Sequence, residues 1–398
     1  MPTLLQINVT ANWGSTGKIA EQIGVLAQQQ GWDSYIAYGR NMNPSQNKLI
    51  KIGSMFDVYE HYFENRFFDN EGRASRRATA KFLKEVDKIK PDIVHLHNIH
   101  DHYINYALLF RYFAENKIPV IWTQHDLWSM TGHCAFNLVG CDKWKVQCND
   151  CPIVPFCSLD RSISGYSSKK NSFTSIEKMT IVPVSEWLGN QVKQSYLSNY
   201  PIRVIKNGID IDVFKPQEAE CLDRYGLKAV PYVISVATIW SNAKGLNDFF
   251  RIRELLQEEI KIVLVGLPKK IIKELPDGII GIPRTQSQVE LAQLYSGAQA
   301  LVSLSGSETF GLTIAEALSC GTPAIVYDNT AQPELVDIKT GAVVENGNYH
   351  QVALAIQDFV ANCFKQQHSL DCRLRAVKLF DKEKCFNQYI ELYSKCIG

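Results

Sequence analysis

The strongest constraint on the fold is an alternation, along the whole chain, of short apolar segments with segments of helical spacing. In the first half the expected strands are Leu4–Val9, Tyr35–Tyr38, Ile93–Leu96 and Val120–Thr123. Between the first two, Lys18–Gln30 has apolar residues at helical spacing and is followed by Gly31, a residue that commonly ends helices. Since parallel strands are joined by long crossovers that are usually helices, the alternation predicts a parallel sheet covered on both faces.

The second half of the chain repeats this pattern with its own elements. The expected strands are Tyr232–Ala237, Lys261–Val265, Ala300–Leu304 and Pro323–Tyr327, and the expected helices are Leu246–Leu256, Ser287–Ser296 and Thr313–Leu318. A chain of 398 residues is too long for one ordinary core. We therefore expect an α/β protein with two Rossmann-like, doubly wound domains that face a cleft.

The expected domains are residues 1–185 and 186–374, with a boundary near Val184–Ser185 or a little later, around Asn207–Pro216. Residues 375–398 form the third part, and their amphipathic stretch Arg375–Cys396 predicts a C-terminal helix that packs back on the first domain.

Composition excludes several classes of protein. The apolar fraction of 45% and the charged fraction of 21% are typical of a globular chain, and a net charge of +1 gives no global reason to expect nucleic acid. The start has no signal-peptide pattern, and no apolar run reaches the roughly 18 residues of a membrane span. With 11 cysteines, an odd number, the chain suits reduced thiols, so we expect a cytoplasmic protein.

Two glutamates with seven residues between them mark the most informative segment, Ser305–Ala317. Glu308 follows an expected strand, and Glu316 lies in the first turns of the next helix. Ligands of open α/β sheets bind beyond the carboxyl ends of strands, and the N–H groups of a helix start suit phosphate. A carboxylate suits the hydroxyls of a ribose. The alternative is that both glutamates are ordinary acidic residues near a helix start, each of which stabilises the helix by roughly a few tenths of a kcal/mol.

The first loop, Asn12–Lys18, contains Gly14 and Gly17 but is not a P-loop, because Asn12 and Ile19 stand where a glycine and a Ser or Thr are required. It also lacks the first glycine of the dinucleotide-binding fingerprint. The glycine pair could let the backbone approach a phosphate, or simply form a tight turn.

Taken in order, the motifs resemble glycosyltransferase family 4, the retaining nucleotide-sugar transferases of the GT-B fold. They are Gly14-Ser-Thr-Gly17, His125-Asp126, Lys206-Asn207-Gly208-Ile209-Asp210, Lys244-Gly245, Ser305–Ala317 and Gly321-Thr-Pro323. The resemblance covers nearly the whole chain and implies transfer of a hexose-type sugar from a nucleotide-diphosphate donor, with no cofactor required for the chemistry. Thr131–Cys134 and Cys151-Pro152 also resemble signatures of a bacterial subgroup that assembles polysaccharides such as capsule, lipopolysaccharide or exopolysaccharide. This resemblance implies a glycan or lipid-linked acceptor.

The resemblance also implies roles for individual residues. Glu308 would contact hydroxyls of the donor sugar, Glu316 would contact the ribose, and Lys244 would contact the departing diphosphate. Many family members place a second cation at the diphosphate, an arginine at the position that Ile239 occupies here. His125 would orient the donor sugar near the reacting carbon. The expected catalytic residues are thus His125, Lys244 and Glu308; the expected donor-binding residues are Gly14, Gly17, Lys244, Glu308, Phe310, Gly311, Leu312, Thr313 and Glu316.

Four histidines, His95, His97, His100 and His102, form a tight cluster near an expected strand end. His95 and His97 could ligate zinc, but we favour a lining of the cleft, with His100 and Asp101 meeting the acceptor.

The insert 131–160 is rich in cysteine. Cys134, Cys141, Cys148 and Cys151 could form a structural zinc site, and Cys157 is close in sequence. Thiols without metal, or local disulfides, are the alternatives. In either case we expect the insert to shape the acceptor side.

Residues 60–90 interleave eight Arg or Lys residues with Phe63, Phe67, Phe68 and Phe82. This pattern fits either a solvated helix face or contact with an anionic membrane or a diphosphate-linked acceptor.

For the whole protein, two other functions are kept: a nucleotide-sugar epimerase on the same fold, and a catalytically silent nucleotide-binding subunit.

Overall fold

The computed structural model describes residues 1–136, 140–153 and 159–397. The chain divides into two compact units. Unit 1 consists of Met1–Lys206 with Phe386–Gly398, and unit 2 consists of Asn207–Cys385. Within the described ranges, no helix combines the length and the apolar character that a membrane span needs.

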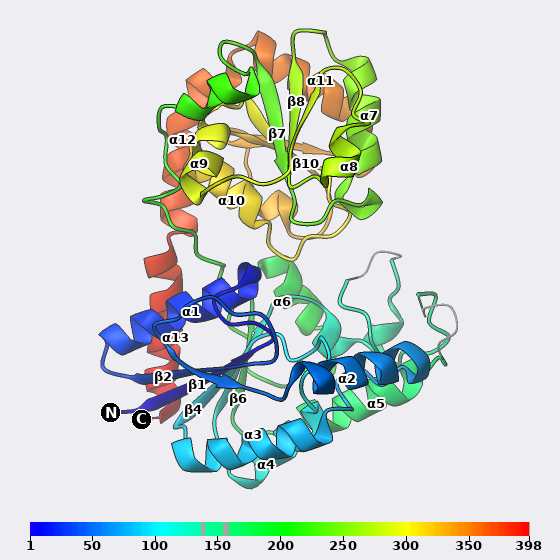
Figure 1. Cartoon of the computed structure of the whole chain (residues 1–398), viewed down its shortest axis with the longest axis vertical. Helices are drawn as coiled ribbons and strands as arrows, with labels where there is room; N and C mark the ends of the chain where they lie inside the picture. Colours follow the sequence, from blue (N-terminus) through cyan, green and yellow to red (C-terminus); the bar gives the residue numbers. More distant parts are fainter. Residues whose placement is uncertain (137–139, 154–158, 398) are drawn as a thin grey trace. The chain divides into compact units, whose positions relative to one another are not determined.

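Unit 1 is built around a six-stranded parallel sheet with the order β3-β2-β1-β4-β5-β6. The central strand β4 is buried along its whole length, as a strand covered on both faces must be. Figure 1 shows helices on both faces of this sheet. The strands are β1 (Thr3–Asn8), β2 (Asp33–Tyr38), β3 (Lys48–Lys51), β4 (Ile93–Leu96), β5 (Val120–Gln124) and β6 (Met179–Pro183); the helices are α1 (Gly14–Gln29), α2 (Met55–Phe68), α3 (Arg76–Ile89), α4 (Tyr106–Glu115), α5 (Ser162–Phe173) and α6 (Glu186–Val192).

Unit 2 repeats the architecture with the order β12-β11-β10-β7-β8-β9. Its core is mostly aliphatic, and Phe249, Leu264 and Val302 are among its fully buried side chains. The strands are β7 (Tyr232–Val236), β8 (Lys261–Val265), β9 (Ile279–Ile282), β10 (Ala300–Ser303), β11 (Ala324–Tyr327) and β12 (Gly341–Val344); the helices are α7 (Leu246–Leu255), α8 (Lys269–Ile272), α9 (Gln288–Gly297), α10 (Leu312–Ser319), α11 (Tyr349–Ala361) and α12 (Phe364–Leu379).

In both sheets the first strand of the unit lies beside the fourth: β1 beside β4, and β7 beside β10. At such a pair the winding of the chain reverses, so the loops that follow the two strands diverge and leave room for a ligand at the carboxyl edge. The loops after β7 and β10 carry Lys244 and Glu308. The loops after β1 and β4 lead to Gly14 and His100. The candidate residues thus gather where this fold offers binding sites.

All eight expected strands are present, with ends shifted by a residue or two. The helix expected over Lys18–Gln30 is present as α1, but it begins earlier, at Gly14, so it includes the end of the expected loop. One helix prediction was wrong. The single helix expected over Arg375–Cys396 is two, α12 and α13 (Lys382–Ile397), since Phe380 and Asp381 leave the helix to pair with the chain at Ile209.

The boundary between the units lies between Lys206 and Asn207, at the later of the two expected positions, and not at 185/186. The stretch from 186 to 206 stays with unit 1, because α6 follows β6 directly and Ile202 pairs with Ile181 of that strand. Of residues 375–398, only Phe386–Gly398 belong to unit 1. There the hydroxyl of Tyr393, in α13, lies 2.6 Å from His95 Nδ1, so the end of the chain joins the buried sheet.

Gly208 explains part of the asparagine-glycine-aspartate motif. A Cβ atom at this position would lie 2.3 Å from the Cα atom of Lys382. Two backbone hydrogen bonds join these segments, from Ile209 N–H to Phe380 O at 2.7 Å and from Lys382 N–H to Ile209 O at 3.0 Å. The motif therefore has a packing role within unit 2, beside the point where the chain leaves it.

Candidate functional site

Lys244 and Glu308 are brought together at the switch point of unit 2. Lys244 ends the short 3-10 turn Asn242–Lys244, and Glu308 lies in the loop after β10. The Lys244 ammonium donates to the Glu308 carboxylate and, over 3.1 Å, to Ser305 Oγ. The two charged side chains are 36% and 26% exposed, so an incoming ligand can reach both.

Backbone packing holds this pair in place. Gly245 has a φ of +75°, and a Cβ there would lie 2.4 Å from Leu304 Cβ. The same two loops are joined by a hydrogen bond from Gly306 N–H to Ala243 O at 2.8 Å. The loop after β7 is therefore pressed against the loop after β10, which only a glycine at position 245 allows.

A polar network supports the loop of Glu308. The Glu308 N–H donates to Thr330 Oγ1 at 2.9 Å, and Ala331 N–H donates to Glu308 O at 3.0 Å. The buried Gln332 amide donates to Ser305 O at 2.9 Å. Sequence motifs did not reveal these supporting residues. They follow β11, and only the pairing of β10 with β11 brings them to the loop of Glu308, so no local pattern of the sequence could have found them.

The start of α10 combines an open backbone with a buried anchor. Gly311 precedes the helix with a φ of +102°, a left-handed conformation that favours glycine. Phe310 is buried and packs edge-on against Phe380, with ring centroids 5.7 Å apart. Leu312 and Thr313 lie in the first turn of the helix, where the N–H groups point beyond the helix start rather than to a carbonyl of an earlier turn.

Glu316 is held by a buried tyrosine. The hydroxyl of Tyr295, from α9, donates to Glu316 Oε2 at 3.1 Å. Burial, together with the negative charge of Glu316, raises the pKa of Tyr295 well above its usual range, so the hydroxyl remains a donor. The Glu316 carboxylate is half-buried and fixed in direction, on a different element from the Lys244–Glu308 pair.

In unit 1 the two glycines of the first loop differ in role. Gly14 begins α1 with a φ of +66°, and a Cβ there would meet nothing within 4 Å. Gly17 lies in the first turn of the helix, where a Cβ would lie 2.6 Å from Thr10 Oγ1. Gly14 therefore satisfies a backbone conformation, while Gly17 permits close packing of α1 on the loop after β1.

His125 belongs to a buried chain of polar groups. The Gln6 amide donates to Ala20 O at 2.8 Å, which turns Gln6 Oε1 toward His97 Nε2, 3.1 Å away. His97 Nε2 must then carry a proton, so His97 Nδ1 accepts from His125 Nε2, 3.2 Å away. Burial lowers the pKa of His125 to about 4, so the ring is neutral near pH 7 and Nδ1 is its acceptor atom.

His95 is a structural residue. Its Nδ1 lies 2.6 Å from Tyr393 Oη and its Nε2 2.7 Å from Thr123 Oγ1. Both ring nitrogens are therefore engaged in hydrogen bonds within the core, which leaves no ring nitrogen of His95 for a metal ion.

His100 and Asp101 form an ionic network. His100 Nε2 lies 2.8 Å from Asp126 Oδ2, and Asp101 pairs with Arg40 at 2.9 Å. Although burial opposes the charge, Asp126 and Asp101 together raise the pKa of His100 to about 10. His100, His125 and Asp126 line one small cavity, while Glu71 comes from the loop beyond α2 to accept from the N–H of Asp101 at 3.3 Å.

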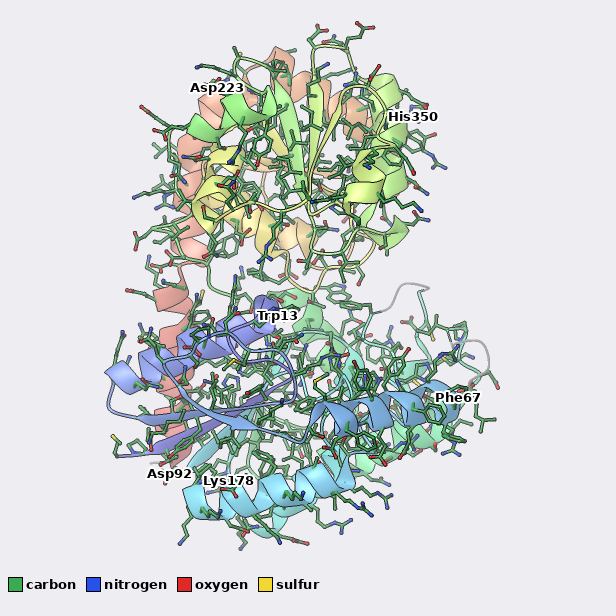
Figure 2. All side chains as sticks on the ribbon, in the orientation of Figure 1. Trp13, Phe67, Asp92, Lys178, Asp223 and His350 are labelled. Carbon is green, nitrogen blue, oxygen red and sulfur yellow. The ribbon has the colours of Figure 1, made fainter. Side chains whose placement is uncertain are left out.

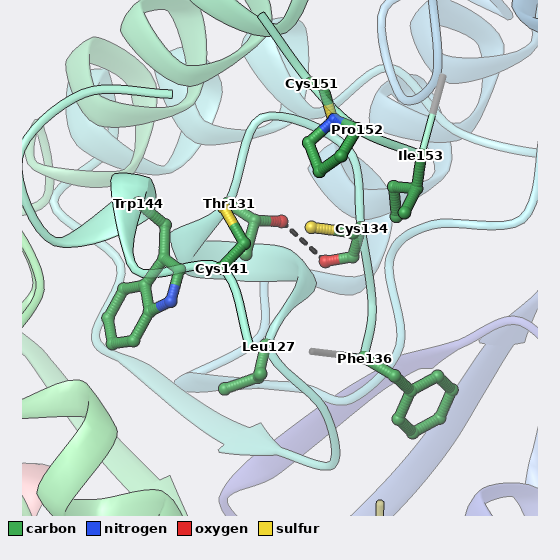
Figure 3. A pocket seen from close by; sticks show the side chains of 9 residues that line it. All are labelled: Leu127, Thr131, Cys134, Phe136, Cys141, Trp144, Cys151, Pro152 and Ile153. Carbon is green, nitrogen blue, oxygen red and sulfur yellow. Dashed lines mark hydrogen bonds between the residues drawn. The ribbon is translucent and has the colours of Figure 1, made fainter. Parts of the chain in front are cut away.

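The cysteines Cys134, Cys141, Cys148 and Cys151 are reduced thiols around a common cavity, and Figure 3 shows three of them. Cys157 lies outside the described residues.

Two family models match the chain one after the other. The model for Glycosyltransferase Family 4 matches residues 19–213, and the model for Glycosyl transferases group 1 matches residues 226–374. The chain is similar over its length to the putative colanic acid biosynthesis glycosyl transferase WcaC of Escherichia coli (strain K12). The two are 23% identical over 412 residues, which cover 98% of this chain and 99% of WcaC.

Solved structures share the fold. Sucrose-phosphate synthase from Thermosynechococcus elongatus superposes with a TM-score of 0.75 at 17% identity, over 99% of both chains. Anabaena HepE in complex with UDP-glucose has a TM-score of 0.68 at 13% identity, again over 99% of each chain. At these identities the likeness concerns the fold alone, and it confirms the two-domain α/β architecture of the GT-B type.

Proposed function

We propose that this glycosyltransferase, in which a family 4 domain is followed by a group 1 domain, moves a hexose-type sugar from a nucleotide-diphosphate donor. The proposed acceptor is a glycan or a lipid-linked molecule, and the proposed transfer retains the anomeric configuration. The observation that carries the proposal is the Lys244–Glu308 pair at the switch point of unit 2. HepE, which shares the fold, binds UDP-glucose in its solved complex, and this supports a donor of the same class.

The pair suggests how the donor is received. Before binding, Lys244 and Glu308 neutralise each other. A diphosphate would compete for the ammonium, and Glu308 would then be released to accept hydrogen bonds from hydroxyls of the sugar. Glu316, held by Tyr295, would accept from the ribose hydroxyls. The N–H groups at the start of α10 would face the phosphates.

In the proposed reaction, the bond between the anomeric carbon and the diphosphate oxygen breaks and a bond to the acceptor oxygen forms. Lys244 and the backbone N–H groups stabilise the charge that develops on the leaving diphosphate. The proton of the acceptor hydroxyl leaves on the diphosphate. Ile239, where many family members have arginine, is 77% exposed and uncharged, so Lys244 carries more of this task.

Unit 1 would supply orientation. Neutral His125 would orient the donor sugar, and the charged His100 with Asp101 would meet the acceptor. These two roles rest on the family resemblance and are tested by His125→Ala and His100→Gln, each measured for turnover and for donor binding.

A membrane-bound acceptor is supported by α2, which exposes a set of aromatic side chains; Figure 2 labels Phe67 among them. The following helix, α3, exposes Arg76, Arg77, Lys81 and Lys84. Exposed aromatic rings and cations, here on two consecutive helices, suit an anionic membrane surface. The exposed aromatic residues of α2 are Phe56, Tyr59, Tyr62, Phe63, Phe67 and Phe68.

The proposal is tested by a thermal-shift screen of nucleotide sugars that contain uridine, guanosine, adenosine, cytidine or thymidine. A ligand of the folded state raises the melting temperature by mass action, so the true donor should give a concentration-dependent shift. Glu316→Ala should abolish that shift. A flat response to every nucleotide sugar would contradict the donor site.

A silent binding subunit remains the second candidate, because Ile239 leaves the expected pair of cations incomplete. Such a protein would bind the nucleotide sugar but release no nucleoside diphosphate with any acceptor. A transferase would show turnover that Glu308→Ala removes.

A further inference from the structure

The connection between β5 and α5 is long and almost without regular structure. In its described part, the only helical pieces are the 3-10 turns Trp128–Met130 and Lys143–Lys145. Yet the side chains of Trp144 and Cys148 are buried. Long segments without helices or strands need another source of order, which in loop-rich regions is often a metal ion or disulfides.

Four thiols converge on this region. Cys134, Cys141, Cys148 and Cys151 line a single cavity together with His133 and Trp144. Figure 3 shows Cys134, Cys141 and Cys151 around the neighbouring hollow, which they line with Leu127 and Trp144. Cys148 and Cys151 have the two-residue spacing that is common in zinc sites.

Two contacts at the sulfur atoms are typical of the surroundings of metal-bound thiolates. The backbone N–H of Gly132 donates to Cys148 Sγ at 3.2 Å. His133 Nε2 lies 3.1 Å from Cys151 Sγ, while its Nδ1 lies 3.3 Å from Asp69 Oδ2. Such N–H groups offset negative charge on sulfur, and a carboxylate behind the imidazole fixes its orientation.

We propose that Cys134, Cys141, Cys148 and Cys151 bind one structural Zn²⁺ ion as four thiolates. Among the described residues no three of these sulfurs lie within 4.8 Å of one another, so binding turns the thiols inward around the ion. The thiols lose their protons to solvent as the four Zn–S bonds form. The buried ammonium of Lys169, which donates to Trp128 O at 2.8 Å, adds positive charge to the same region.

The test is the metal content of the full-length protein, purified under reducing conditions from cells supplied with zinc. We expect about one zinc ion per chain, as in structural tetrathiolate sites. Cys148→Ser with Cys151→Ser should remove it. The matched control, Cys221→Ser with Cys363→Ser, changes two cysteines of unit 2 and should keep it.

A second measurement keeps the test decisive if the double variant does not fold. Wild-type protein stripped by a chelator and refilled with Co²⁺ should show the visible absorption of a tetrahedral cobalt–thiolate centre. Wild-type protein that holds no zinc and gives no such spectrum would overturn the proposal. So would zinc that remains in a folded Cys148/Cys151 variant, or a disulfide between these cysteines found by mass spectrometry under non-reducing conditions.

Discussion

Replacing Lys244 by methionine separates a role in turnover from a role in stability. The change keeps most of the aliphatic stem and removes the charge that reaches Glu308 and Ser305. Because the pair is 36% and 26% exposed, its loss should cost about 0–1 kcal/mol of folding free energy. Loss of a group that stabilises the leaving diphosphate should cost about 3–4 kcal/mol in the transition state, or roughly 100- to 1,000-fold in kcat.

The assay measures nucleoside diphosphate released from the donor found in the thermal-shift screen, with a membrane lipid extract as the source of acceptor. The matched control is Lys382→Met. Lys382 pairs with Asp210 at 2.6 Å in the same unit, with exposures of 29% and 24%. The control should lose a similar amount of stability and retain its turnover.

Two results would refute the reasoning. If Lys244→Met keeps kcat within a few-fold of the wild type, Lys244 does not stabilise the leaving group. If Lys382→Met loses turnover to the same extent, the effect of Lys244 arises from general disturbance of unit 2.

Three further outcomes are expected. Tyr295→Phe should weaken donor binding, measured by calorimetry, roughly five- to tenfold, because it removes the hydrogen bond to Glu316, which contributes about 1 kcal/mol. The control Tyr225→Phe, which breaks a similar hydrogen bond to Glu290, should leave donor binding unchanged. Gly208→Ala should lower the free energy of unfolding by about 1–3 kcal/mol in urea denaturation, because the new Cβ meets the backbone of Lys382; an unchanged midpoint would contradict this. Because the pKa of His100 is raised from 6.5 to about 10, its ion pair with Asp126 should add folding stability that is fully present below pH 6.5 and is lost as the pH rises through 10. If the difference in stability between His100→Gln and the wild type does not vary over that range, the ion pair is excluded.

The sequence predicted the parallel α/β architecture because apolar runs and helical periodicity are local properties of the chain. It also placed Glu308 in the loop after a strand and Glu316 within the helix that follows, as observed. It did not predict β3, β6, β9 and β12, which are the edge strands of the two sheets. None of these four strands is buried along its whole length, so the burial that makes central strands continuously apolar acts on them less.

By itself, therefore, the sequence determined the kind of fold and the loops that carry the candidate residues. Tertiary structure alone decided which of them meet. Lys244 and Glu308 are 64 residues apart, and they touch because β7 and β10 are neighbours in the sheet. The tautomer of His125 is likewise set by Gln6 through His97. Gln6 lies in β1, whereas His97 follows β4 and His125 follows β5. Such pairings follow from strand order, a long-range property that local patterns do not contain.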